Sequence, residues 1–321
     1  MGINIVRFDE RGTIKWGVLD DEKVYEVKGD YPTLAVFLEK GADVARKIVA
    51  GDKQHGGLDL DSLHLLSPVT SPAQIVCQGA NYSAHREEAG LESERPPFNL
   101  IFTKANSSLT GPNDDILCPS HVRLLDYEIE VGLIVRKEIT EPIHVTLNNI
   151  AEYVAGFVIT NDVSARDTQL SEGQWFKGKS YRSFCPAGPI LYLIEDHEAS
   201  YIHNLELKLT VNGEVRQSAH TEQLLYKPEE TITELSETMS FYPGDLLMTG
   251  TPGGVALKLT SEEFNLLSNP FTKYEDKMKI LIDSQKGNRH YLKDGDVVTS
   301  EVQSSDGKIH LGKQTNRVVF N

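Results

Sequence analysis

The sequence predicts a mixed β protein with some α-helix, in which a small N-terminal α/β domain (residues 1–70) precedes a larger β-rich domain (residues 71–321). Three observations support this prediction. Short apolar runs bounded by turn residues recur along the chain, as they do in antiparallel sheets. A chain of 321 residues is long enough for one large domain and a smaller one. With 25% charged and 39% hydrophobic residues, its composition is that of a globular protein.

The first 70 residues are expected to combine short strands with one helix. The strands are expected over residues 4–8, 14–19 and 23–27. A helix is expected from about Thr33 to Ala50, because apolar residues recur there at roughly helical spacing. Pro68 and Pro72 mark the link into the larger domain, so the boundary is placed near residue 70.

The larger domain is expected to consist mainly of strands. Asn212-Gly213 is the strongest hairpin signal in the chain, and it predicts a turn between strands at 206–211 and 214–217. The other expected elements are strands over 151–160, 297–303 and 308–311, and a short helix over 261–267.

Composition limits the partners and the location of the protein. The chain has 32 Lys and Arg residues against 47 Asp and Glu, a net charge of −15, and we expect no nucleic-acid partner because no basic patch is visible. No apolar stretch approaches the length of a membrane span. The first residues lack the pattern of a signal peptide, and the three scattered cysteines fit no disulfide framework. We therefore expect a cytoplasmic protein without membrane contact.

Glu128 and Glu130 lie in an expected strand whose odd positions, from Tyr127 to Val135, are apolar. By local pattern alone, the favoured interpretation is a half-buried strand with its acidic face in water. The alternative is a metal site, because residues two apart on a strand point to the same face. Asp162, 32 positions after Glu130, could supply a third carboxylate to an all-oxygen site for a hard divalent cation.

His85 and Glu88 form a second candidate pair, three residues apart in an expected helix from Ser83 to Ala89. A carboxylate beside an imidazole raises its basicity and suits a general base that acts on water. Taken alone, however, the pair is more typical of an incidental surface ion pair. Lys104 ends an expected strand, where it could bind a substrate carboxylate or simply lie in water.

Arg166 and Gln169 lie one helical turn apart and could face one ligand together, the guanidinium binding a carboxylate. Thr251 lies in a glycine-rich turn that could hold an anion or be an ordinary turn. Residues 173–180 match a phosphate-binding loop by letter and contain Lys179, but the polar residues before them and the prolines after them do not predict the strand and helix that this loop requires.

In their order along residues 70–320, these motifs resemble the fumarylacetoacetate hydrolase family. The motifs are His85-x-x-Glu88, Lys104, Glu128-x-Glu130, the stretch from Asp162 to Gln169, Lys179-Ser180 and Thr249-Gly250-Thr251-Pro252. The resemblance implies a β-roll of mixed sheets and a homodimer, with residues 1–70 similar to the small N-terminal domain of some members. Leu257 to Tyr291 is longer and more polar than the resemblance leads us to expect.

The resemblance also implies roles for the candidate residues. Glu128, Glu130 and Asp162 would hold Mg²⁺ or Mn²⁺. His85 and Glu88 would orient and activate water, and Lys179 would stabilise developing negative charge. The residues that would contact the substrate are Lys104, Arg166, Gln169 and Thr251.

The expected activity is metal-dependent hydrolysis of a carbon–carbon bond in a 1,3-diketo acid, an acylpyruvate or a compound like fumarylacetoacetate, through a metal-stabilised enolate. The same site could instead decarboxylate oxaloacetate or isomerise a 2-hydroxyhepta-2,4-diene-1,7-dioate in aromatic catabolism. Two alternatives from other classes are a non-catalytic, metal-binding member of the family and a P-loop nucleotide binder.

Overall fold

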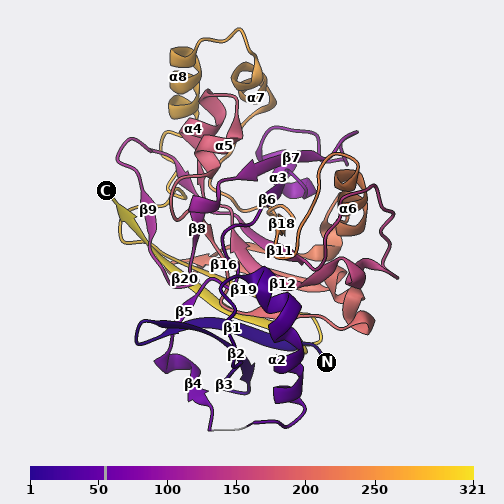
Figure 1. The fold of residues 1–321 in the computed structure, drawn as a ribbon. Helices are drawn as coiled ribbons and strands as arrows, with labels where there is room; N and C mark the ends of the chain where they lie inside the picture. The colour runs from indigo at the N-terminus through magenta and orange to yellow at the C-terminus, as the bar shows by residue number, and fades with distance from the viewer. Residues whose placement is uncertain (54–55) are drawn as a thin grey trace.

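Two β-sheets contain most of the strands in the computed structural model, which describes residues 1–53 and 56–321 (Figure 1). The larger, eleven-stranded sheet has the order β4-β3-β2-β1-β15-β12-β11-β18-β6-β7, with β5 paired to β1. Its strands are β1 (Ile3–Glu10), β2 (Thr13–Asp20), β3 (Lys23–Glu26), β4 (Leu58–Asp59), β5 (His64–Leu66), β6 (Ile75–Gly79), β7 (Leu100–Lys104), β11 (Ile129–Val135), β12 (Val154–Asn161), β15 (Leu191–Leu193) and β18 (Leu246–Met248).

The second sheet has five strands in the order β17-β16-β19-β20-β9. They are β9 (Ile116–Cys118), β16 (Leu205–Val211), β17 (Glu214–His220), β19 (Val297–Ser304) and β20 (His310–Phe320). Two short pairs complete the strands: β10 (Leu125–Asp126) with β13 (Ser164–Ala165), and β8 (Leu109–Thr110) with β14 (Cys185–Pro186). The predicted β-rich class is confirmed.

The α-helices are short. They are α1 (Leu34–Val36), α2 (Ala42–Val49), α3 (Ser83–Glu88), α4 (Arg166–Ser171), α5 (Trp175–Lys179), α6 (Pro228–Ser236), α7 (Ser261–Ser268) and α8 (Tyr274–Ser284). In the part of the chain that the structure describes, none of them is long and apolar enough to cross a membrane.

The N-terminal region has the predicted three strands and helix. The helix is α1 and α2 joined by a π-helical turn over Phe37–Gly41, and it begins where the Thr33 hydroxyl accepts a hydrogen bond from Val36 N. Trp16 of β2 stacks on Phe37 at a centroid distance of 4.4 Å, which fixes the helix on the sheet. Strand β1 also pairs with β15, so this sheet continues into the larger domain. The boundary near residue 70 stays a prediction.

The main core lies between the two sheets. Apolar residues of β11 and β12 pack there against those of β16, β19 and β20. The predicted hairpin joins β16 to β17. Asn212 and Gly213 both have positive φ angles, as the central residues of this type of tight turn require. Every residue of β11 is buried, because neighbouring strands and the second sheet enclose it. The interpretation of Glu128 and Glu130 as a solvated face is therefore wrong.

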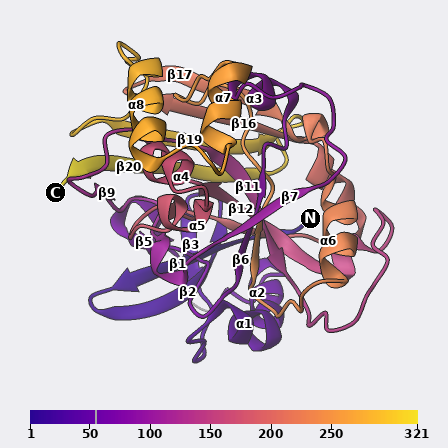
Figure 2. The same ribbon diagram turned by 90° about the horizontal axis from the view of Figure 1, so that it is seen from above.

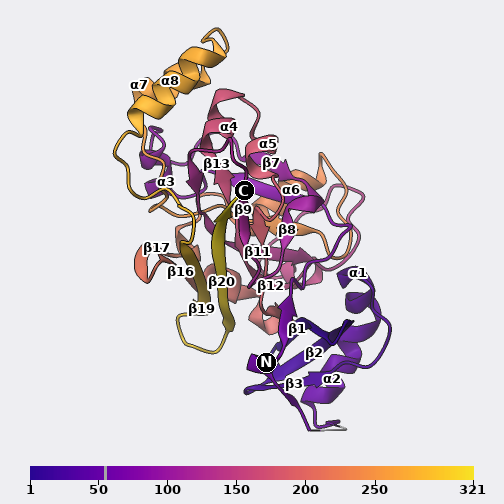
Figure 3. The same cartoon turned by 90° about the vertical axis from the view of Figure 1, so that its left-hand side faces the viewer.

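The long segment after the glycine-rich turn forms a helical pair. The expected helix over 261–267 is α7, and α8 follows it. Both pack on α4, next to which Figure 2 shows them from above, and they project beyond the sheets on the side away from the N-terminal strands (Figures 1 and 3). Helix α4 also occupies the place where a phosphate-binding loop at 173–180 would need a strand, and α5 covers most of that motif itself. This contradicts the P-loop alternative.

Candidate active site

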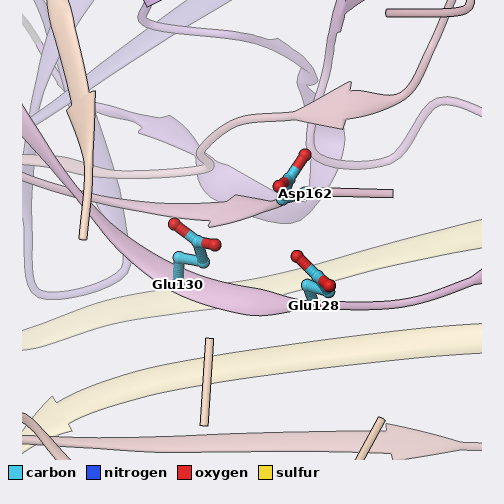
Figure 4. A group of neighbouring side chains, drawn as sticks. All are labelled: Glu128, Glu130 and Asp162. Atoms are coloured by element: carbon cyan, nitrogen blue, oxygen red, sulfur yellow. The ribbon is translucent and has the colours of Figure 1, made fainter. Parts of the chain in front are cut away.

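The three predicted metal ligands meet at one point. Glu130 lies on β11, Glu128 immediately precedes this strand, and Asp162 follows β12. Because β11 and β12 are paired, with Asp162 N donating to Glu128 O at 2.8 Å, the two strands bring the carboxylates together. Figure 4 shows both glutamates rising from one ribbon toward Asp162. Their side chains are buried, and one oxygen from each lies within 4.8 Å of the others.

Three cationic side chains surround these carboxylates. Lys179 Nζ lies 2.7 Å from Glu128 and 2.5 Å from Asp162. Lys104 Nζ contacts the other oxygen of Asp162 at 2.5 Å. Arg166 pairs with Glu128 at 2.5 Å through Nη2 and with Asp126 at 2.8 Å through Nε. Four buried carboxylates therefore face three cations, which leaves one negative charge when all are ionised.

The pKa values of the two glutamates are shifted in opposite directions. Burial raises the pKa of Glu128, but Arg166 and Lys179 outweigh burial and hold it below its ordinary value. Burial raises the pKa of Glu130 well above its ordinary value, and Asp162 and Glu128 raise it further. Burial lowers the pKa of Lys179, but the carboxylates of Asp162 and Glu128 outweigh it and the pKa is raised.

The residues fit a hard divalent cation. All three candidate ligands are carboxylates, the oxygen donors that Mg²⁺ and Mn²⁺ prefer. Among the described residues, the Glu130 carboxylate has no ion pair and accepts one backbone hydrogen bond, from Gly250 N at 2.8 Å. A cation beside Glu130 would supply the charge that this buried group lacks.

His85 lies on α3 as predicted and is buried. Burial and, after it, the positive charges of Arg166 and Lys179 lower the pKa of His85 to about 3, so the imidazole is neutral at pH 7. Its Nδ1 has no hydrogen-bond partner among the described residues. A neutral imidazole with a free ring nitrogen can accept a proton.

The Glu88 carboxylate contacts the glycine-rich turn and the segment after it. Both of its carboxylate oxygens accept from Gly254 N at 2.9 Å, and Lys258 forms an ion pair with it. Within the described residues, no hydrogen bond joins Glu88 to His85. The catalytic pairing of these two residues stays a prediction.

A pocket lies beside the carboxylate cluster, and Glu128 is the candidate ligand that lines it among the described residues. The other polar side chains of its lining are Gln78, His85, Arg166, Gln169, Lys179 and Thr251. Glu130, Asp162 and Lys104 are absent from this lining, and Lys104 is buried against Asp162. A further cavity, in the N-terminal region around Tyr25 and Ile48, contains none of the predicted residues.

The predicted substrate-contacting residues are already engaged. Arg166 Nη1 donates to Gln169 Oε1 at 3.0 Å, which orients the amide at the pocket. The Thr251 hydroxyl donates to Ile129 O at 2.9 Å and accepts from Gln217 at 2.8 Å. The contact of these residues with a substrate stays a prediction.

Two further residues position the site. Asp126 accepts hydrogen bonds from Ala256 N and Leu257 N at 2.8 and 3.1 Å, besides its pair with Arg166. It precedes Glu128 with the same two-residue spacing, which was a usable signal in the sequence. Gln217 ties the strand to the glycine-rich turn, since it accepts from Ile129 N and donates to Thr251 and Pro252. No sequence pattern marks Gln217.

The fold and site define a class: a mixed-sheet protein with a buried carboxylate cluster, fit for a divalent cation, beside a small pocket. The chain belongs to the fumarylacetoacetate hydrolase family. Residues 74–319 match the family described as fumarylacetoacetate (FAA) hydrolase C-terminal, and residues 4–68 match the one described as Rv2993c-like, N-terminal.

Similar proteins include named enzymes of this family. The chain is 38% identical over 229 residues to the mitochondrial oxaloacetate tautomerase Fahd2a of Rattus norvegicus, covering 70% of each chain. It is 36% identical over 255 residues to the 2,4-didehydro-3-deoxy-L-rhamnonate hydrolase of Sphingomonas sp. (strain SKA58), covering 78% of this chain and 84% of that protein. Since the rat relative is named as mitochondrial, the cytoplasmic location stays a prediction.

Solved structures share the fold over the whole chain. A probable 2-hydroxyhepta-2,4-diene-1,7-dioate isomerase from Mycobacterium abscessus has a TM-score of 0.72 at 27% identity, covering 100% of this chain and 99% of that one. The fumarylacetoacetate hydrolase of Exiguobacterium antarcticum has a TM-score of 0.70 at 28% identity, covering 99% of this chain and 100% of that one. The fold that the family resemblance implied is confirmed.

Proposed function

We propose that this chain is a Mg²⁺- or Mn²⁺-dependent hydrolase that cleaves a carbon–carbon bond in a 1,3-diketo acid, an acylpyruvate or a fumarylacetoacetate-like compound. One observation carries the proposal: neutral, buried His85 lines the same pocket as Glu128 and Lys179. A proton acceptor and a charged cluster that can stabilise an anion therefore face the same space.

The charge of the site suits an anionic substrate. Glu128, Glu130 and Asp162 would hold the cation, which supplies polarisation of the substrate carbonyl and stabilisation of an enolate when it is bound. A divalent cation would change the net charge of the buried cluster from one negative to one positive. A site with one positive charge attracts the carboxylate of a 2-oxo acid.

The residues of the chain would divide the reaction between them. His85 takes a proton from water, whose oxygen attacks the distal carbonyl carbon of the substrate. The carbon–carbon bond next to that carbonyl breaks, and its electron pair passes to the pyruvate part as an enolate. Lys179 faces this negative charge, and Gln169, oriented by Arg166, faces the substrate oxygens. A proton then adds to the enolate carbon, which gives pyruvate beside a carboxylic acid.

A second candidate is enolate chemistry without attack by water. The 38% identity to an oxaloacetate tautomerase favours this candidate. Tautomerisation of a 2-oxo acid needs only proton transfer and stabilisation of an enolate, and the site could supply both. Decarboxylation of oxaloacetate and isomerisation of a 2-hydroxyhepta-2,4-diene-1,7-dioate use the same intermediate type. The non-catalytic alternative predicts Mn²⁺ binding without turnover of any of these compounds.

One assay separates these candidates. Acetylpyruvate, fumarylpyruvate and oxaloacetate are incubated with the protein, with and without EDTA, while pyruvate, carboxylic acid, CO₂ and the enol absorbance are followed separately. Pyruvate with a carboxylic acid in equal amounts, lost in EDTA, is the expected result. Pyruvate with CO₂ would indicate decarboxylation in place of hydrolysis, and loss of enol absorbance alone would indicate tautomerisation.

A further inference from the structure

One apolar part of the active-site pocket lining, the wall, comes from four parts of the chain. β7, α4 and α5 contribute to it, and the segment from Leu257 into α7 completes it. The wall residues are Phe102, Leu170, Trp175, Leu257, Leu259 and Phe264. Phe102 and Trp175 meet edge to face at a centroid distance of 5.2 Å, so this side of the wall is held by ring packing.

Among the described lining residues, the pocket offers a substrate no Lys or Arg side chain that is free of a carboxylate partner. Its Lys and Arg side chains are Arg166 and Lys179, and both pair with Glu128. Lys258 lies next to the wall in sequence but pairs with Glu88. A carboxylate at the distal end of a substrate would lose its water at this wall without gaining a partner, which is unfavourable.

The segment from Leu257 into α7 supplies three of the six wall residues. Leu257 and Leu259 lead into α7, and Phe264 lies half-buried on it. Leu267 and Leu281 anchor the pair in an apolar cluster of its own, separate from the main core. The segment that is longer than the family resemblance predicts therefore contributes to the wall of the pocket.

We propose that the enzyme selects substrates whose distal group is uncharged and apolar, an alkyl or aryl acylpyruvate, and that Phe264 is a specificity-determining residue. This inference rests on the proposed hydrolase function. Each methylene of an apolar chain that is buried against the wall is expected to raise the affinity for the substrate by a factor of about 4. A distal carboxylate, as in fumarylpyruvate, gains no such contact.

The test compares kcat/KM for acetylpyruvate, heptanoylpyruvate and fumarylpyruvate with Mn²⁺ present. The kcat/KM for heptanoylpyruvate is expected to exceed that for fumarylpyruvate by about 10-fold or more. Phe264→Ala is expected to lower the heptanoyl-to-acetyl ratio by about 10-fold. Phe271→Ala is the matched control, because this ring is 92% exposed between α7 and α8 and should leave the ratio unchanged.

A second variant tests the role of Phe264 if Phe264→Ala does not fold. Phe264→Lys adds a cation to the wall and is expected to raise the fumaryl-to-heptanoyl ratio by about 10-fold. Equal use of the three compounds, or a preference for fumarylpyruvate in the wild type, would overturn the inference. An unchanged ratio in both Phe264 variants would overturn the role of Phe264.

Failure of the proposed function gives a different result. If no acylpyruvate is hydrolysed, the hydrolase proposal fails, and the same compounds are compared as ligands by thermal shift in Mn²⁺. A larger shift with heptanoylpyruvate than with fumarylpyruvate, reduced in Phe264→Ala, would still support the apolar selection. Equal shifts would overturn it.

Discussion

At the scale of single residues, Glu130 differs from the other two candidate ligands because it has no cationic partner among the residues that the structure describes. Glu130→Gln keeps its shape and removes its charge, so we expect the affinity for Mn²⁺ to fall about 10-fold to 100-fold. Isothermal titration measures this loss. Exposed Glu206→Gln on β16 is the control. An unchanged affinity in Glu130→Gln would remove this residue from the metal site.

The raised pKa of Glu130 leads to a second expectation for the same variant. Burial and two neighbouring carboxylates already favour the uncharged form of this side chain in the metal-free protein. Glu130→Gln should therefore not lower the free energy of unfolding in EDTA, as measured by urea denaturation. A loss of about 3 kcal/mol or more would indicate that the ionised carboxylate stabilises the fold.

The lowered pKa of His85 is expected to make the free energy of unfolding depend on pH. Its pKa is lowered to about 3 in the folded protein, against an ordinary value near 6.5, so the unfolded chain binds more protons between these values. The free energy of unfolding should fall as the pH drops below 6.5, and His85 should account for about 2 kcal/mol of that loss at pH 5. Urea denaturation at pH 8 and pH 5 measures the change.

His85→Asn should reduce this pH dependence and should also lower kcat by about 100-fold to 10,000-fold. His290→Asn, at an exposed position, serves as the control for both measurements. If His85→Asn retained the pH dependence of the wild type, the neutral buried imidazole would not be its cause. If it retained the wild-type kcat, His85 would not be the base.

At the scale of elements, the α7–α8 pair rests on its own small apolar cluster. Leu281 is fully buried there, so Leu281→Ala should destabilise the pair by about 2–5 kcal/mol. Because this cluster is separate from the main core, we expect faster proteolysis within residues 260–290. Leu266→Ala, on the exposed side of α7, is the matched control. Equal proteolysis of both variants would contradict a separate cluster.

Element by element, the predictable parts were those with strong local signals. The N-terminal strands, the Asn212-Gly213 hairpin and α7 follow from apolar spacing and turn residues. The enclosed setting of β11 could not be predicted, because its burial comes from strands and a second sheet that are distant in sequence. For the same reason, the contacts of the Glu88 carboxylate with Gly254 and Lys258 could not be predicted, and the pairing of Glu88 with His85 stays a prediction.

At the scale of the whole molecule, the order of weak motifs carried more information than any motif alone. It led to the family, the fold and a cluster of residues that the chain does bring together. It did not lead to the ion pairs of Lys104 and Arg166, because a sequence does not show which carboxylate a distant cation meets.

Oligomeric state is a prediction at this scale. We expect the homodimer implied by the family, and sedimentation velocity should give about twice the chain mass of 35.7 kDa. The measurement is made at several protein concentrations with Mn²⁺ and with EDTA. A single species with the mass of one chain at micromolar concentration would contradict the dimer.

We propose that the buried carboxylate cluster holds a divalent cation that enolate chemistry requires. Acetylpyruvate hydrolysis, measured during a Mn²⁺ titration of EDTA-stripped protein, tests this metal requirement most directly. We predict negligible turnover without metal, saturable recovery with Mn²⁺, and a recovery curve shifted to at least about 10-fold higher Mn²⁺ in Glu130→Gln. Full turnover in EDTA, or an identical curve for the variant, would contradict the claim.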